Sequence, residues 1–225
     1  MTDQHTLIQQ NFTIINAAIR DAEQDANRKG GHVDLIAVSK KQPLSRIKEA
    51  LDTGHRSFGE NRVQEAYKHW QDHRQNYPDL TLHLIGPLQS NKTADAVALF
   101  DVIHTVDRPK IARYIKAEME KQQRAVKCLL QLNIGNEPQK SGVTPEGLED
   151  LLNYCKEIDL KISGLMCIPP YGESSEPYFK DMAALALKYD LKELSMGMSD
   201  DYASAISMGA TMVRVGSALF GERTT

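Results

Sequence analysis

The chain reads Val33-Asp-Leu-Ile-Ala-Val-Ser-Lys40 in its first strand-like run, which is mostly apolar and ends in polar residues. Seven further runs of comparable length follow it, rich in aliphatic or β-branched residues, as buried strands are. The eight predicted strands are Val33–Lys40, Ser57–Glu60, Leu82–Gly86, Val102–Val106, Lys127–Asn133, Ile162–Ile168, Glu193–Gly197 and Met212–Phe220.

Helical patterns separate these runs. Pro109 suits the first turn of a helix from Pro109 to Lys121, and Thr144 and Pro145 suit the N-cap and first position of another. Helical crossovers between apolar strands in a chain of 225 residues predict a single (β/α)8 TIM barrel, an α/β fold. A Rossmann-type sheet is the rival, but no Gly-x-Gly-x-x-Gly motif follows any predicted strand.

The sequence stops a few residues after the last predicted strand, so the barrel lacks a final helix. We expect an extra N-terminal helix over Leu7–Arg28 to take that place. No linker, low-complexity segment or block of like charge interrupts the chain. Residues 1–225 are therefore expected to form a single domain.

The composition excludes several classes of protein. With 27 Lys+Arg against 30 Asp+Glu and a net charge of −3, we expect no nucleic-acid surface. The apolar runs are too short to span a bilayer. The polar N-terminus lacks a secretory signal, and the three cysteines form no Cys-x-x-Cys pair, which predicts a cytoplasmic protein with buried, reduced thiols.

Lys40 is the strongest candidate for chemistry. Functional residues of barrels stand at the carboxyl ends of the strands, and Lys40 ends an apolar strand. Partial desolvation there favours a neutral, nucleophilic amine, which can form a Schiff base with an aldehyde. The alternative is a lysine that only reaches out to water. Alternation sends Lys40 and Lys41 to opposite faces of the strand but does not say which of them faces inward.

The last two strand ends suggest a phosphate site, because barrels frequently bind phosphate between these loops. Ser199 can cap a helix that begins near Asp200, while Gly216 and Ser217 offer bare backbone and a hydroxyl. An ordinary N-cap and a turn glycine are the alternative interpretation.

Arg214 lies within an apolar run, so its guanidinium must either face the barrel lumen or extend outward between helices. The sequence favours neither direction.

His69 and His73 are four residues apart on a predicted helix but have no third ligand nearby, so no metal site is expected.

Several longer motifs, taken together, resemble the YggS/PROSC family of pyridoxal phosphate homeostasis proteins. The similarity runs in order from about Leu7 to Gly221. The motifs are Ala37-Val-Ser-Lys40, Phe58-Gly-Glu-Asn-Arg-Val-Gln-Glu65, His83-Leu-Ile-Gly-Pro-Leu-Gln-Ser-Asn-Lys92, Lys140-Ser-Gly142, Gly164-Leu-Met166, Ser195-Met-Gly-Met-Ser-Asp-Asp201 and Val213-Arg-Val-Gly-Ser217.

The resemblance implies a barrel like the N-terminal domain of alanine racemase, with pyridoxal 5'-phosphate as cofactor. It implies that Lys40 carries the cofactor as a Schiff base and that Asn61 lines the pocket. The implied phosphate ligands are Ser199, Gly216 and Ser217, and Arg214 would face the pyridine nitrogen.

The function that the resemblance implies is buffering or delivery of the cofactor, with an influence on amino-acid and keto-acid balance. No catalytic residue and no reaction are assigned. Apo forms of pyridoxal phosphate enzymes would be the acceptors, and a monomer is expected because a self-contained barrel site needs no partner subunit.

Two alternative functions are a racemase-type pyridoxal phosphate enzyme and a Schiff-base aldolase without cofactor. A chain of 225 residues leaves no room for the second domain of such racemases.

Overall fold

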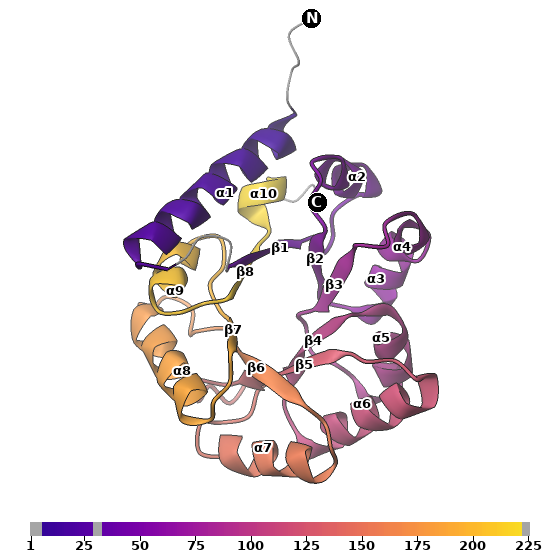
Figure 1. Ribbon diagram of the computed structural model, residues 1–225, viewed down its shortest axis with the longest axis vertical. Coiled ribbons are helices and arrows are strands. Elements are labelled where there is room, and N and C mark those ends of the chain that lie inside the picture. Colours follow the sequence, from indigo (N-terminus) through magenta and orange to yellow (C-terminus); the bar gives the residue numbers. More distant parts are fainter. Residues whose placement is uncertain (1–5, 29–32, 222–225) are drawn as a thin grey trace, which may run out of the picture.

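Eight parallel strands close into a barrel in the computed structural model, which describes residues 6–28 and 33–221 (Figure 1). Each strand pairs with the next along the chain, and the last pairs with the first, where Arg214 lies opposite Ile36. The strands are β1 (Asp34–Val38), β2 (Ser57–Glu60), β3 (Thr81–Leu84), β4 (Val102–Val106), β5 (Lys127–Leu132), β6 (Ile162–Cys167), β7 (Glu193–Ser195) and β8 (Met212–Val215). The predicted (β/α)8 barrel is confirmed.

Helices form an outer ring around the strands (Figure 1). They are α1 (Leu7–Asp25), α2 (Leu44–Asp52), α3 (Val63–Trp70), α4 (His73–Asn76), α5 (Thr93–Leu99), α6 (Pro109–Gln122), α7 (Leu148–Glu157), α8 (Glu176–Lys188), α9 (Tyr202–Ser207) and α10 (Ser217–Phe220), with a 3₁₀ turn, η1 (Ser90–Lys92). Among the described residues, none of these helices has the length and apolar character needed to cross a membrane.

Several predicted bounds differ from the structure by one to three residues, as in the N-terminal helix, which ends at Asp25 rather than Arg28. Two further predicted boundaries are wrong. The last strand ends at Val215, and Ser217–Phe220 forms α10, because an apolar run satisfies a buried helix as well as a buried strand. The helix predicted to open at Thr144 begins at Leu148 instead. The Thr144 hydroxyl accepts a hydrogen bond from the Gly147 backbone N–H at 3.3 Å, so Thr144 closes a turn just before the helix.

The N-terminal helix packs beside the short α10 that follows the last strand. α1 packs against α9, α10 and α2, and Figure 1 shows it lying along the β8–β1 side of the barrel. Ile8, Phe12, Ile15 and Ile19 recur at helical spacing and are all buried, so one apolar stripe faces the barrel. The Asn11 side chain also donates a hydrogen bond to the Leu219 carbonyl at 2.9 Å. The expected role of this segment is confirmed.

The barrel lumen has its own small apolar layer, separate from the core between strands and helices. Ile36, Val102, Leu129 and Met212 pack together inside the barrel. Because successive strand residues point to opposite faces, residues two positions further along these strands also face the lumen. This parity places Val38 on β1 and Arg214 on β8 above the apolar layer, toward the carboxyl ends of the strands.

A chain of polar groups, buried except for Asp34, crosses the barrel near the amino-terminal ends of its strands. Ser57 donates to the Asp34 carboxylate at 3.0 Å, and the Ser57 hydroxyl lies 3.1 Å from Nε2 of His83. Nδ1 of His83 lies 2.9 Å from Nε2 of His104. One proton on each imidazole satisfies these contacts, and burial favours the neutral form of both rings. Burial lowers the pKa of His83 to about 3 and that of His104 well below its usual range.

The neutral His83 predicts a pH dependence of stability. The unfolded chain binds a proton near pH 6.5 that the folded chain rejects until about pH 3. The free energy of unfolding should therefore fall as the pH falls through this window, by up to about 1.4 kcal/mol per pH unit for this one group. The free energy of unfolding, measured with urea between pH 5 and 7, should change less steeply with pH in His83→Gln than in the wild type. Ser57→Ala should lower this free energy at every pH without changing how steeply it depends on pH. An equal pH dependence in His83→Gln and the wild type would contradict the assignment.

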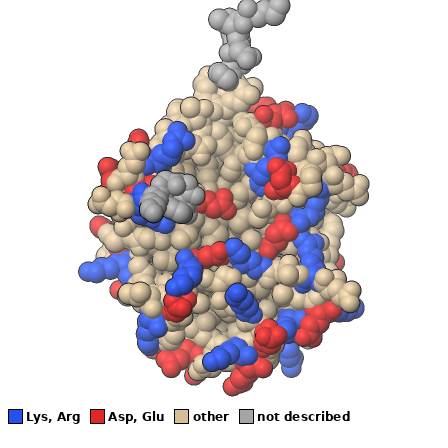
Figure 2. Space-filling view, in the orientation of Figure 1, with Lys and Arg blue, Asp and Glu red and all other residues tan. Residues whose placement is uncertain are grey.

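The three cysteines are free and buried, as predicted. Burial raises the pKa of Cys128 and Cys167 to about 12 and that of Cys155 to about 11, so each thiol stays protonated at neutral pH. On the face seen in Figure 2, basic and acidic side chains are interspersed without a broad region of one sign.

Candidate functional site

A cavity of about 490 Å³ opens where the carboxyl ends of the parallel strands meet. We call it the barrel-mouth cavity. Residues at or just beyond the ends of β1, β2, β3, β5, β6, β7 and β8 line it, so it draws on nearly the whole circumference of the barrel. The six residues that the sequence singled out all lie in its lining: Lys40, Asn61, Ser199, Arg214, Gly216 and Ser217.

The structure separates Lys40 from Lys41. Ile36 lies in the lumen, and Val38 and Lys40 both line the barrel-mouth cavity, two and four positions further along the chain. Lys41 has a left-handed backbone conformation (φ +59°), and its side chain lines a different cavity. The backbone N–H of Lys41 donates to the carboxylate of Glu65, which holds this turn. The sequence left the inward-facing lysine open, and the structure assigns that place to Lys40.

Arg214 faces the lumen rather than the helices. The residue is 4% exposed and lines the barrel-mouth cavity. Its guanidinium donates to the Ser195 hydroxyl at 2.6 Å and to the Cys167 carbonyl at 2.8 Å. Burial lowers the pKa of Arg214 from its ordinary value. Arg214 forms no salt bridge with any residue in the described part of the chain, so this positive charge is available to a ligand.

The ends of β7 and β8 bring two hydroxyls together. The Ser217 hydroxyl donates to the Ser199 hydroxyl at 3.2 Å. A Cβ on Gly216 would lie 3.3 Å from Cβ of Val38, so glycine keeps this wall of the cavity close to β1. Ser199 does not cap a helix as predicted, because α9 starts at Tyr202 and its N-cap residue is Asp201.

The cavity lining also contains polar residues that the sequence analysis did not assign to the site, and two of them are Gln131 and Lys140. Gln131 lies on β5, two positions after the lumen residue Leu129, and its Nε2 donates to the Ser141 carbonyl at 3.0 Å. Its Oε1 is buried and has no hydrogen-bond partner among the described residues. Lys140 also lines the cavity and donates to the Pro169 carbonyl at 3.0 Å. Gln131 could have been predicted from the sequence, because a glutamine inside an apolar strand is unusual.

His69 and His73 do not share a helix, because α3 ends at Trp70 and α4 begins at His73. Nδ1 of His69 lies 2.8 Å from Oε1 of the buried Glu60. Burial alone would lower the pKa of His69, but the hydrogen bond and charge of Glu60 outweigh it and raise that pKa.

Glu60 connects this pair to the lysine turn. Oε1 of Glu60 also accepts hydrogen bonds from the Ser39 hydroxyl at 2.7 Å and from the Trp70 indole at 3.1 Å. Ligand atoms of Glu60, Glu65 and His69 lie within 4.8 Å of one another. Oε1 of Glu60 takes three donors, while its Oε2 is buried without a hydrogen-bond partner among the described residues. The three contacts of Oε1 make Glu60 a hydrogen-bond centre that fixes Ser39 next to Lys40.

Comparison with known proteins agrees with this geometry. The family described as "Alanine racemase, N-terminal domain" matches residues 15–224. The chain is 41% identical to the pyridoxal phosphate homeostasis protein of Vibrio cholerae over 96% of both chains, and 41% identical to that of Pseudomonas aeruginosa, again over 96% of both. It belongs to the pyridoxal phosphate homeostasis protein family. Among solved structures, PipY of Synechococcus elongatus with PLP bound is 36% identical, with a TM-score of 0.81 over 95% of this chain and 100% of PipY.

Members of this family share the barrel with larger enzymes. The alanine racemase of Clostridium difficile has a TM-score of 0.70 at 15% identity and is covered over 58% of its length, which shows the fold alone. The resemblance to the family that the motifs predicted is confirmed, and so is the alanine-racemase-like barrel.

Pyridoxal phosphate carries an aldehyde, a phosphate and a ring nitrogen, and the barrel-mouth cavity offers a group for each. An amine, two adjacent hydroxyls and a buried guanidinium line one space of about 490 Å³. The unpartnered Oε1 of Gln131 leaves a buried acceptor that a ligand donor can satisfy. The residues present therefore fit the cofactor that the family name indicates.

Proposed function

We propose that the barrel-mouth cavity binds pyridoxal 5'-phosphate and that the protein takes part in the homeostasis of this cofactor. The observation that carries the proposal is that Lys40, the Ser199–Ser217 hydroxyl pair and Arg214 line one cavity in a chain 36% identical to a protein solved with PLP bound. When bound, the cofactor supplies an aldehyde that a lysine amine can hold as a Schiff base.

Each residue has one part in the proposed complex. Lys40 provides the amine, and Asn61 provides part of the wall beside it. Ser199 and Ser217 donate hydroxyl hydrogens to the phosphate, and Gly216 keeps the backbone close to it. These five residues would hold the cofactor in place.

Arg214 would meet the pyridine nitrogen as a hydrogen-bond donor, since a guanidinium has donors only. It therefore leaves the ring nitrogen without a proton, which weakens the cofactor as an electron sink. This favours binding and release over carbanion chemistry, so we assign no catalytic reaction. Release to apo enzymes that need the cofactor would make the protein a buffer and a source of it. All the proposed ligands come from one chain, so a single copy suffices.

The amine assignment is tested by trapping. Wild-type protein loaded with pyridoxal phosphate should absorb near about 420 nm, as protein-bound Schiff bases of this cofactor do. Borohydride reduction followed by peptide mapping should place the tag on Lys40. Lys40→Ala should lose that tag and bind the cofactor at least about tenfold more weakly, because the covalent link contributes more than about 1.4 kcal/mol.

Lys41→Ala is the matched control, since it removes the neighbouring amine from the other cavity. It should keep both the tag on Lys40 and the wild-type affinity. A tag on Lys41 in the wild-type protein, or an unchanged affinity in Lys40→Ala, would contradict the proposed function.

A further inference from the structure

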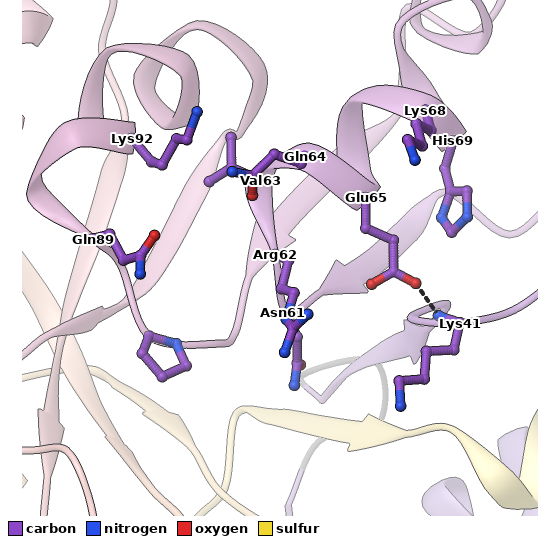
Figure 3. Close-up of a pocket in the computed structure, with 11 residues that line it drawn as sticks. Lys41, Asn61, Arg62, Val63, Gln64, Glu65, Lys68, His69, Gln89 and Lys92 are labelled. Carbon is purple, nitrogen blue, oxygen red and sulfur yellow. Dashed lines mark hydrogen bonds between the residues drawn. The ribbon is translucent and has the colours of Figure 1, made fainter.

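A second and larger cavity lies beside the first, over the start of α3. Its volume is about 1020 Å³, and Figure 3 shows its lining from the β1–α2 turn, α3 and the segment after β3. We call it the basic cavity. Asn61 and Pro87 line both cavities, so the two spaces are neighbours. None of the proposed cofactor ligands other than Asn61 contributes to it.

The charge of this lining is strongly one-sided. Four cationic side chains line the basic cavity, Lys41, Arg62, Lys68 and Lys92, against a single carboxylate, Glu65. Glu65 already accepts a hydrogen bond from the Lys41 backbone, and Figure 3 shows it beside that turn. The excess of positive charge in a concave surface concentrates anions from solution.

Most of these cations are not neutralised by the protein. Lys92 lies 3.6 Å from the carboxylate of Asp95. Lys41, Arg62 and Lys68 form no salt bridge with any residue within 6–28 and 33–221. In a chain of net charge −3, a cavity lined by three cations without a salt bridge is a local excess of positive charge.

The cavity also offers uncharged donors. The first residues of α3, Val63 to Glu65, line the cavity, and the N-cap residue Arg62 has no side-chain acceptor atom that could cap their backbone N–H groups. The amides of Gln64 and Gln89 stand in the same lining (Figure 3). Oxygen-rich anions accept hydrogen bonds from both kinds of donor.

From this lining we infer that the basic cavity is a second ligand site, which binds the phosphate group of a small phosphorylated metabolite without a covalent bond. A planar guanidinium matches phosphate in two parallel hydrogen bonds, and the lysines supply the remaining charge. The volume exceeds what a bare ion needs, which leaves room for the organic part of the ligand. A metal ion is disfavoured by the same four cations.

The experiment titrates glycerol 3-phosphate into the full chain loaded with pyridoxal phosphate, so that the barrel-mouth cavity is occupied. Calorimetry and amide NMR shifts should show saturable binding, with shifts centred on Arg62–Lys68. Glycerol, which lacks the phosphate, should not bind. Removing two charges in Arg62→Gln/Lys68→Gln should weaken binding at least about tenfold, while leaving the loading with cofactor unchanged.

Lys121→Gln/Lys192→Gln is the matched control, because it removes two exposed positive charges outside the cavity. It should bind glycerol 3-phosphate as the wild type does.

Repeating the titration with ligand-free Ser199→Ala/Ser217→Ala separates the two sites. The basic cavity of this variant should still bind glycerol 3-phosphate, even if the proposed cofactor site is wrong. Equal binding by Arg62→Gln/Lys68→Gln, loss of binding in Ser199→Ala/Ser217→Ala, or no saturation below about 10 mM would overturn the inference.

Discussion

Replacing Arg214 by methionine should leave the ligand-free protein at least as stable as the wild type while weakening pyridoxal phosphate binding by about 30-fold. The guanidinium is buried and has no carboxylate partner among the described residues, so folding removes an unpaired charge from water. Even after relaxation that desolvation costs several kcal/mol. The two hydrogen bonds, to Ser195 and Cys167, offset only part of this cost.

The expected loss in binding has a different origin. A charge-assisted hydrogen bond to a ligand contributes about 2 kcal/mol, which corresponds to about 30-fold in affinity. Urea unfolding with and without saturating cofactor measures both effects on the same samples. The methionine variant should show an equal or higher midpoint without ligand and a much smaller ligand-induced increase.

Ser195→Ala is the control, since it keeps the buried charge and removes one acceptor. It should lower the stability of the ligand-free protein by about 1 to 3 kcal/mol. A methionine variant that is destabilised by more than about 2 kcal/mol would show instead that Arg214 serves the fold.

The strand order and the outer helices could be predicted because each strand carries its own signal. Ser57–Glu60 and Val102–Val106 have the predicted bounds, since polar or turn residues end both runs. The break at Gly216 was missed because Leu219 and Phe220 stay apolar and buried in a short helix. Local composition reports burial, and burial alone does not separate a strand from one helical turn.

Local patterns gave candidates for the site but not the direction of their side chains. A strand end made Lys40 a candidate and an apolar run made Arg214 one, and only the family resemblance implied that both face the cavity. Which face of β1 and β8 points inward depends on the closure of the barrel. That closure pairs the first strand with the last, which no local pattern encodes. The basic cavity was missed for a similar reason, because Lys41, Arg62 and Lys92 come from three separate segments.

Replacing Gly86 by alanine should destabilise the protein by about 3 kcal/mol or more and also weaken cofactor binding. A Cβ at this position would lie 2.2 Å from the carbonyl oxygen of Asn61 and 2.8 Å from its Cα, which are backbone atoms. Neither the backbone at Gly86 nor the backbone at Asn61 can move away easily, because hydrogen bonds hold both segments. The Gly86 carbonyl accepts a hydrogen bond from Thr105 at 2.9 Å, and the Glu60 carbonyl accepts one from the Ile85 N–H at 2.9 Å.

Gly172→Ala separates this clash from the general effect of losing a glycine. Gly172 has φ +82° and no atom within 4 Å of its would-be Cβ, so only backbone strain of about 1 kcal/mol is expected. Both variants restrict the unfolded chain equally. Urea unfolding compares their stabilities, and cofactor titration should show a loss only for Gly86→Ala, because Asn61 lines the barrel-mouth cavity. If the two variants were equally stable, the close approach of β2 and β3 at the cavity wall would not constrain the site.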